Sequence, residues 1–250
     1  MSVETMTELL EAGVHYGHQT KRWNPRMRDF ILEEKNSIHI IDLSKTVDQL
    51  IKAGDFLAGV TRQGGKILFV GCKKQAQEAV KEAAQASGQY YVNQRWLGGT
   101  LTNFVTIRKS ISKLKDFEAL EKSAGFNKIN KAEASALRRE ANRIRQNLEG
   151  VLEMEKLPDV IVIIDTVKEA IAVAESLRLG IPIVAVVDSN SNPEEINYPI
   201  AGNDDAIRAI RIILQKLVDS ITKSKGLQGG NRAGAAAPTP DTEVLAGVAE

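Results

Sequence analysis

Residues 159–188 read DVIVIIDTVKEAIAVAESLRLGIPIVAVVD, and this stretch decides the fold. Its two apolar runs, 159–165 and 181–188, each end in an aspartate and have the length of buried strands. The segment between them, 167–179, has a helical pattern that stops at Gly180. Strand, helix and strand in this order predict two parallel strands joined by a crossover helix.

The same alternation occurs along most of the chain. Two further apolar runs, KILFVG and YYV, predict strands at 66–71 and 90–92. Helical patterns are predicted at 42–62, 73–86 and 204–222. These elements together predict an α/β fold with a doubly wound parallel sheet. We also expect a hairpin of residues 30–32 with 38–41 to add to the edge of this sheet.

The alternation breaks between residues 101 and 156, where no strand pattern occurs. Apolar residues recur three or four positions apart on both sides of the polar link KSAGFNKINK, which is typical of a coiled coil. The segment is therefore predicted to be an inserted antiparallel coiled-coil helical hairpin, with arms of roughly 30 Å. Such an arm suits dimerisation, a clamp on a partner protein or a lever on RNA.

This pattern divides the chain into three parts. Residues 1–100 and 157–225 are predicted to form one discontinuous α/β globular domain, and 101–156 form the hairpin inserted into it. The last stretch, 226–250, is rich in Gly, Ala and Pro and has almost no core-forming residues, so we expect it to be disordered.

Composition excludes several classes of protein. A chain of 250 residues with 43% hydrophobic residues can bury a sizeable core, and no run of about 18 apolar residues predicts a membrane span. The amino terminus lacks the basic flank and apolar stretch of a secretory signal, so a cytoplasmic protein is expected. Cys72 is the single cysteine, which rules out an internal disulfide and a Cys-rich zinc site.

Positive charge is unevenly distributed, although the net charge is only +1. Four basic residues and no acidic one lie between Gln19 and Arg28, and residues 101–145 contain eleven basic and five acidic residues. This asymmetry indicates that a polyanion contacts part of the surface. Two solvated helix faces would give the same pattern, and charge alone does not separate the two interpretations.

The stretch NQRWLGGTLTNF, residues 93–104, precedes the insertion. In an enzyme, its two glycines would bring the backbone close to a substrate and Trp96 would form a pocket wall. In an RNA-binding protein, Arg95 would pair with a phosphate and Trp96 would offer an apolar face. A tight turn with a buried tryptophan is the third interpretation.

No motif of a nucleotide-dependent enzyme is present, because the sequence lacks both a Walker loop and a G-x-G-x-x-G after the first strand. The nearest candidate is FVGCKKQAQEA, in which Cys72 lies at a helix start beside Lys73 and Lys74. That position would acidify a thiol, but no histidine base lies nearby in sequence. A small buried cysteine is the simpler interpretation, and the two lysines are candidates for RNA phosphate contacts.

One set of side chains has the chemistry of a metal site. The carboxyl ends of parallel strands meet at one edge of an open sheet, and Asp188, Asp204 and Asp205 are expected there. If the loop that carries His18 folds over this edge, His18 joins the three aspartates. An imidazole with carboxylate oxygens suits zinc, whereas magnesium prefers oxygen ligands alone. We expect one structural divalent metal, with zinc favoured, although helix capping by Asn203 or Asp204 would also explain part of this set.

Six motifs, taken in order, carry a resemblance to a known family: AGVHYGHQTKRWNP, KILFVG, NQRWLGGTLTN, LPDVIVIID, LGIPIVAVVDSNSNP and GNDDAIRAI. Over roughly residues 4–224 the chain resembles the S2 family of bacterial small-subunit ribosomal proteins. Ala201 stands where a proline is expected in this family, which predicts a less rigid turn before Asp204.

The resemblance implies a flavodoxin-like sheet with an inserted coiled-coil hairpin, a non-enzymatic role and a place on the ribosome. It also implies binding to small-subunit ribosomal RNA between head and body, and help in recruiting the subunit's largest protein, which binds messenger RNA. No membrane or small-molecule substrate is expected. The candidate RNA contacts are Lys21, Arg22, Trp23, Arg26, Arg28, Lys73, Lys74, Arg95, Trp96, Arg108, Lys109, Lys113, Arg138, Arg139 and Arg143.

Two rival functions remain open on the sequence. One is an α/β enzyme or nucleotide-binding module that uses the cleft at the strand ends, and the other is a coiled-coil adaptor without RNA. Binding to RNA in a salt-dependent way, with weak affinity for nucleotides, would favour the ribosomal function.

Overall fold

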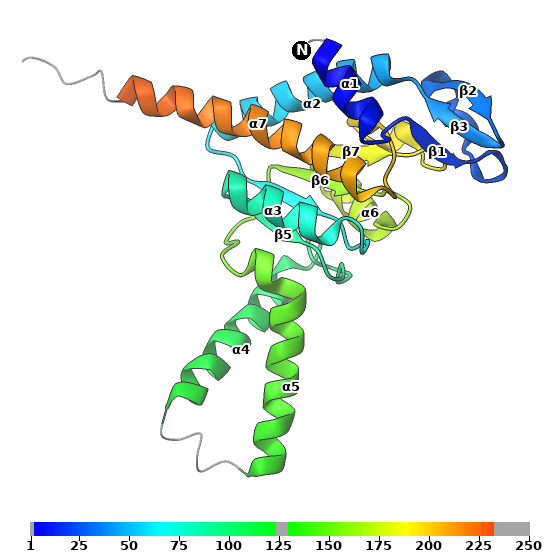
Figure 1. Ribbon diagram of the computed structural model, residues 1–250. Helices are drawn as coiled ribbons and strands as arrows, with labels where there is room; N and C mark the ends of the chain where they lie inside the picture. The colour runs from blue at the N-terminus through cyan, green and yellow to red at the C-terminus, as the bar shows by residue number, and fades with distance from the viewer. Residues whose placement is uncertain (1–2, 124–129, 233–250) are drawn as a thin grey trace, which may run out of the picture.

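A five-stranded parallel sheet forms the centre of the computed structural model, which describes residues 3–123 and 130–232 (Figure 1). Its strands have the order β5-β4-β6-β7-β8. Their bounds are β4 (Ile67–Val70), β5 (Tyr90–Val92), β6 (Val160–Ile164), β7 (Ile183–Val187) and β8 (Tyr198–Ala201). Counted along the chain this is the order 2-1-3-4-5 of doubly wound sheets of the flavodoxin type.

Helices cover both faces of this sheet, because its strands are apolar on both faces. Within β4, Phe69 belongs to one core cluster and Leu68 to the other, as the two-residue period of a strand requires. The first cluster is closed by α1 (Val3–Glu11), α2 (Leu43–Arg62), α3 (Gln77–Ser87) and α7 (Ile207–Arg232). The second is closed by α6 (Ala170–Leu179), by Trp96 and by the base of the insertion.

The insertion contains two long helices, α4 (Phe104–Lys122) and α5 (Lys131–Leu148), which project together from the domain (Figure 1). Their inner side is apolar near the domain, where Ile107, Ile111 and Leu148 join the second core cluster. Farther out, Leu114 and Ala141 are also buried. The predicted helices are therefore present, while their coiled-coil packing stays a prediction.

A second, smaller sheet corrects one expectation. The predicted hairpin forms β2 (Ile31–Lys35) and β3 (Ile38–Ile41), but these strands pair with β1 (Tyr16–Gln19) in a separate antiparallel sheet of order β1-β3-β2. The edges of the main sheet are instead β5 and β8, and β8 pairs in parallel with β7. The hairpin was assigned to the wrong sheet because β1 and β8 were not predicted.

Ala201, the last residue of β8, is hydrogen-bonded to side chains of α2. The Ala201 backbone N–H donates to Gln49 Oε1 at 2.9 Å, and its carbonyl accepts from Thr46 Oγ1 at 2.7 Å. A proline at position 201 would have no N–H for the first of these bonds. Alanine therefore permits a hydrogen bond from the end of β8 to α2.

The carboxyl-terminal helix α7 extends to Arg232, beyond the predicted boundary at residue 226. The rest of the segment that was predicted to be disordered, 233–250, lies outside the described residues. Among the helices that the structure describes, none is both long and apolar enough to cross a membrane.

Candidate metal centre and charged surfaces

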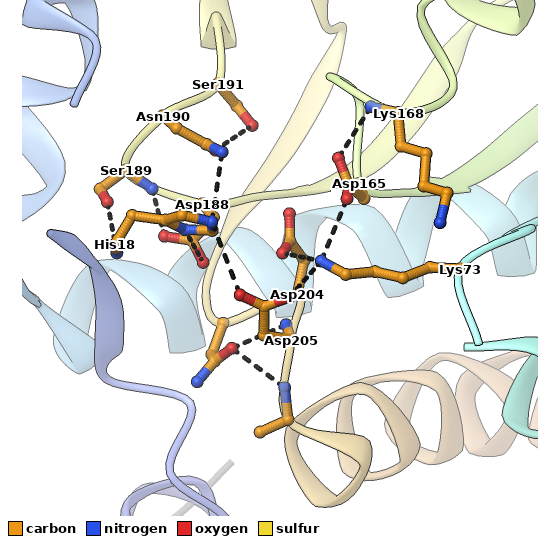
Figure 2. Close-up of polar contacts among 12 residues, drawn as sticks. His18, Lys73, Asp165, Lys168, Asp188, Ser189, Asn190, Ser191, Asp204 and Asp205 are labelled. Carbon is orange, nitrogen blue, oxygen red and sulfur yellow. Dashed lines mark hydrogen bonds and ion pairs between the residues drawn. The ribbon is translucent and has the colours of Figure 1, made fainter. Parts of the chain in front are cut away.

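Five charged side chains gather at the carboxyl ends of the parallel strands (Figure 2). Lys73 follows β4, Asp165 follows β6 and Asp188 follows β7, while Asp204 and Asp205 lie between β8 and α7. This edge of an open α/β sheet is where ligands usually bind, because loops rather than helices border it. The sequence rule that predicted Asp188 at this edge also applies to Asp165, which was overlooked.

His18 reaches this edge because β1 is docked on the segment that follows β7. The His18 backbone N–H donates to Ser189 Oγ at 2.8 Å, and the Asn24 N–H donates to the Ser189 carbonyl at 2.7 Å. A Cβ at Gly17 would lie only 2.8 Å from Ser189 Oγ, so glycine is needed for this close approach.

The imidazole of His18 lies between two carboxylates. Its Nδ1 is 2.9 Å from Asp188 Oδ2, and its Nε2 is 3.5 Å from Asp205 Oδ2. The hydrogen bond with Asp188 is the main reason that the pKa of His18 is raised above its ordinary value, against the effect of burial. Asp188 itself is almost fully buried.

Lys73 supplies a positive charge on the other side of the cluster. Its Nζ lies 3.1 Å from Asp165 Oδ2, 2.7 Å from Asp204 Oδ1 and 2.6 Å from Asp205 Oδ1. Burial opposes the charged form, but the hydrogen bonds to Asp204 and Asp205 raise the pKa of Lys73. Because this side chain is only 11% exposed and held by three carboxylates, we leave Lys73 out of the RNA contacts for which it was predicted.

Asp204 is the carboxylate whose charge is least compensated. Its side chain is 0% exposed, and in the described part of the chain its Oδ2 has no hydrogen-bond partner. Burial, with the nearby charges of Asp165 and Asp188, raises the pKa of Asp204 to about 7. Lys73 occupies only Oδ1, so the buried Oδ2 remains available to a cation.

The structure groups three of the four predicted donors, His18, Asp188 and Asp204, while the metal itself stays a prediction. One ligand atom from each of His18, Asp188 and Asp204 can be chosen so that all three lie within 4.8 Å of one another. Asp205 also lies here, but Lys73 and His18 already share its two oxygens. One nitrogen and two carboxylate oxygens are ligand types that zinc accepts.

Helix capping was the alternative explanation for Asn203 or Asp204, and of these two it is Asn203 whose side chain accepts backbone N–H groups here. Asn203 Oδ1 accepts the backbone N–H groups of Asp205 at 2.8 Å and Ala206 at 3.1 Å. These two bonds form the turn that leads into α7, which begins at Ile207. Asp204 and Asp205 are not needed as caps, so their carboxylates are available for Lys73, His18 and a cation.

Backbone strain also occurs at this site. Asp165 has a φ of +68°, which is uncommon for a residue with a side chain. Its Oδ1 accepts the Lys168 N–H at 2.9 Å, which stabilises this conformation, while Oδ2 faces Lys73. Strained residues of this kind concentrate at functional sites.

Cys72, next to the cluster, is not an activated thiol. Its backbone N–H donates to Glu169 Oε1 at 2.9 Å. Burial, with the charge of Glu169, raises the pKa of the thiol to about 12. A thiol of this kind is not a nucleophile at neutral pH, which agrees with the interpretation of Cys72 as a small packed residue.

The stretch NQRWLGGTLTNF is held in place by a residue that was not predicted. Glu175 of α6 accepts the indole N–H of Trp96 at 3.1 Å and the backbone N–H groups of Gly99, Leu101 and Thr102 at 2.7, 2.9 and 3.0 Å. Gly99 has a φ of +87°, which its lack of a side chain permits. An acidic residue in the apolar run of α6 was the only sequence signal of this role.

Trp96 is accordingly packed rather than displayed, with an exposure of 6%, while Arg95 beside it is exposed. Its indole closes the second core cluster. The segment thus combines a buried anchor with an exposed cation. The predicted contact of Trp96 with RNA is restricted to the little of its surface that remains exposed.

Most of the predicted RNA contacts lie on two separate surfaces, one on the segment between β1 and β2 and the other on α4 and α5; Figure 1 shows these elements apart from each other. The first, beside the small sheet, is formed by two short 3₁₀ helices, Thr20–Arg22 and Pro25–Phe30, and carries Lys21, Arg22, Trp23, Arg26 and Arg28, all exposed. The second follows α4 and α5 and carries Arg108, Lys109, Lys113, Arg138, Arg139 and Arg143, all exposed. Lys74 and Arg95, also exposed, lie on the domain.

These features define an α/β domain with a charged cluster at its strand ends and a projecting helix pair that bears basic side chains. The family described as Ribosomal protein S2 matches residues 9–224, which is most of the chain. The chain therefore belongs to the ribosomal protein S2 family, and it is a structural protein of the small ribosomal subunit.

Proposed function

We propose that this chain acts on the ribosome by binding small-subunit ribosomal RNA through its two basic surfaces. The observation that carries the proposal is the set of exposed cations without carboxylate partners on the described part of the chain, which includes Arg95, Lys113 and Arg143. Exposed cations of this kind bind phosphate and release the counterions of RNA. The shape of the RNA and the positions of its phosphates, more than the identity of its bases, would determine where the protein binds.

The finer assignment follows the family. We propose binding between the head and body of the subunit in the cytoplasm, recruitment of the subunit's largest, messenger-RNA-binding protein, and coiled-coil packing of α4 against α5. The proposed role is not enzymatic. Cys72 has a pKa of about 12, and the Lys73 ammonium is held by three carboxylates, so neither side chain is available as a nucleophile.

The RNA proposal is tested by titrating the purified full chain with small-subunit ribosomal RNA and, separately, with ATP. We expect submicromolar RNA binding that weakens steeply with salt, and no comparable affinity for ATP. Tight ATP binding with weak RNA binding would replace the proposal with a nucleotide-binding function. Replacing Cys72 with alanine should leave assembly into small subunits unchanged.

We further propose that His18, Asp188 and Asp204 hold one structural divalent cation, with zinc favoured over magnesium and Asp205 close enough to contribute. The buried, unpartnered Asp204 Oδ2 supports this proposal. Such an ion would join the β1 segment to the ends of β7 and β8, and would fix a surface on which a protein partner can dock. Magnesium would retain several waters, which suits this nitrogen-containing site less well.

Metal analysis of the purified chain before and after chelation tests this site, with a His18→Ala variant as the comparison. We expect about one zinc per chain, a lower melting temperature after chelation, and no zinc effect in the variant. If the purified chain holds no metal and added zinc does not change its melting temperature, the proposal of a metal site at His18, Asp188 and Asp204 is wrong.

A further inference from the structure

A groove of about 520 Å³ lies where the helix pair joins the α/β domain. One wall comes from the segment 95–98, the others come from α4 and α5, and Ile171 of α6 lies at its rim. Pockets of this size bind ligands as large as a nucleotide. The groove is separate from the charged cluster at the strand ends.

Three cations line this groove, and none has a carboxylate partner among the residues that the structure describes: Arg95, Lys113 and Arg143. Of the other arginines on the helix pair, Arg138 pairs with Glu121 and Arg145 with Glu118. Arg108 donates to the Glu155 carbonyl and Arg139 to Ser135 Oγ. Glu140 is the one acidic residue in the lining, so the groove has an excess of positive charge.

The inner part of the groove is apolar and rigid. Trp96, Ile107 and Leu148 are at most 8% exposed and belong to the second core cluster. Glu175 fixes the Trp96 indole through the hydrogen bond described above. An apolar floor of fixed shape with cations at its rim can receive a flat apolar ring that carries a phosphate on each side.

A neighbouring hollow of about 380 Å³ continues outward between α4 and α5 and shares Lys113, Glu140 and Ile144 with the groove. It gains the acidic Asp116 and no further cation. The charge that attracts phosphate is therefore concentrated at the base of the helix pair.

We propose that the groove receives one unpaired nucleotide of the ribosomal RNA, with its base on the apolar floor and its flanking phosphates at Arg95, Lys113 and Arg143. This inference rests on the proposed RNA-binding function and adds the form of RNA that is recognised. A base inside a regular duplex is stacked and cannot enter, whereas a bulged base is already free to do so.

The test compares two RNA duplexes that differ only in one inserted uridine, which has no pairing partner in the opposite strand. The full chain should bind the bulged duplex about fivefold or more tightly, because one base contacts the protein floor. Arg143→Gln or Lys113→Gln should remove most of this preference. Arg145→Gln is the matched control, because Arg145 is an exposed arginine of α5 that does not line the groove.

Trp96 provides a direct readout of the groove. The chain has two tryptophans, so a Trp23→Phe variant leaves Trp96 as the only one. Saturation with the bulged duplex should change its emission, and saturation with the paired duplex should not.

The possible outcomes separate the two proposals. Equal affinity for both duplexes, with normal salt-dependent binding to the whole ribosomal RNA, would overturn the groove and leave the RNA-binding function standing. No binding to any of these RNAs would overturn both. Hexaglutamate binding that depends on Arg143, without a preference for the bulge, would assign the groove to an acidic peptide instead.

Discussion

Asp204 is the side chain at which the charges of the strand-end cluster fail to balance. Four carboxylates meet there, and among residues 3–123 and 130–232 the cationic groups paired with them are Lys73 and the imidazole of His18. The Asp204 side chain is completely buried, so water does not replace the missing hydrogen-bond partner of its Oδ2. Either a proton or a metal ion compensates this charge, and two predictions follow from that choice.

Replacing Asp204 with asparagine should stabilise the metal-free protein by about 1 kcal/mol, because it removes a buried charge and keeps an oxygen for Lys73. The same variant should lose the stabilisation by zinc. Thermal melts with and without zinc provide the measurement. Asp205→Asn is the control: that carboxylate is half-exposed and already partnered, so its neutralisation should destabilise the metal-free protein. A fall in melting temperature for Asp204→Asn would contradict the charge argument.

Zinc binding should weaken as the pH falls through about 7. The metal requires ionised Asp204, whose pKa in the metal-free protein is about 7, and a neutral His18, whose pKa is raised. Below these pKa values zinc must displace protons, at a loss of about tenfold in affinity per pH unit for each proton. Titration calorimetry at pH 6 and pH 8 gives the difference, and equal affinities would refute this assignment of ligands.

Glu175 connects helix α6 with the segment that precedes α4. Burial opposes its charge, but the backbone N–H groups of Thr102, Gly99 and Leu101 lower the pKa of Glu175 below its ordinary value. The carboxylate therefore stabilises the fold in its ionised form. This contribution is fully present above its ordinary pKa and is lost as the pH falls through the lower folded-state value.

Glu175→Gln should lower the free energy of unfolding by at least about 2 kcal/mol at neutral pH, because several buried donors lose a charged acceptor. The loss should shrink in acid, because the stabilisation by the ionised carboxylate decreases as the pH falls below the ordinary pKa of a glutamate toward the lowered folded-state value. Urea denaturation at pH 7 and pH 3.5 measures both quantities. Glu169→Gln is a useful comparison, because burial raises the pKa of Glu169, so its ionised form does not stabilise the fold as that of Glu175 does. A cost for Glu175→Gln that does not depend on pH would refute the ionic anchor.

The elements that the sequence predicted well are those whose burial is uniform. β6 and β7 are buried at every residue, so their apolar runs identify them. β1 and β8 were missed because YGHQ lacks an apolar run and YPIA contains a proline, and both depend on neighbouring strands for their pairing. The three-stranded sheet was misplaced for the same reason.

The site was predicted only as far as a local rule applies to it. Asp188 was placed at the sheet edge because it ends a predicted strand, and Asp204 because it starts the predicted last helix. His18 was placed there on the assumption that its loop folds over this edge. Lys73 was assigned to RNA because its partners lie at least 92 residues away along the chain and leave no local pattern. Glu175 illustrates the same limit, since its acceptor role appears only when the segment after Trp96 folds back on α6.

For the molecule as a whole, the rigid domain and the projecting helix pair carry two basic surfaces that are far apart (Figure 1). The first lies beside the small sheet and the second on α4 and α5. A single RNA fold that contacts both would be held at two separated places. Affinity would then depend on the total number of phosphates that the protein neutralises, and each surface would contribute its own share of the salt dependence.

The most direct test of this central claim is the salt dependence of binding to small-subunit ribosomal RNA, measured for the full chain and for two triple variants. One variant replaces Lys21, Arg22 and Arg28 with glutamine, and the other replaces Lys109, Lys113 and Arg143. We expect each variant to bind the RNA more weakly. The slope of log affinity against log salt concentration should become shallower by about one for each phosphate that no longer has a cationic partner. An unchanged slope in both variants would contradict this claim.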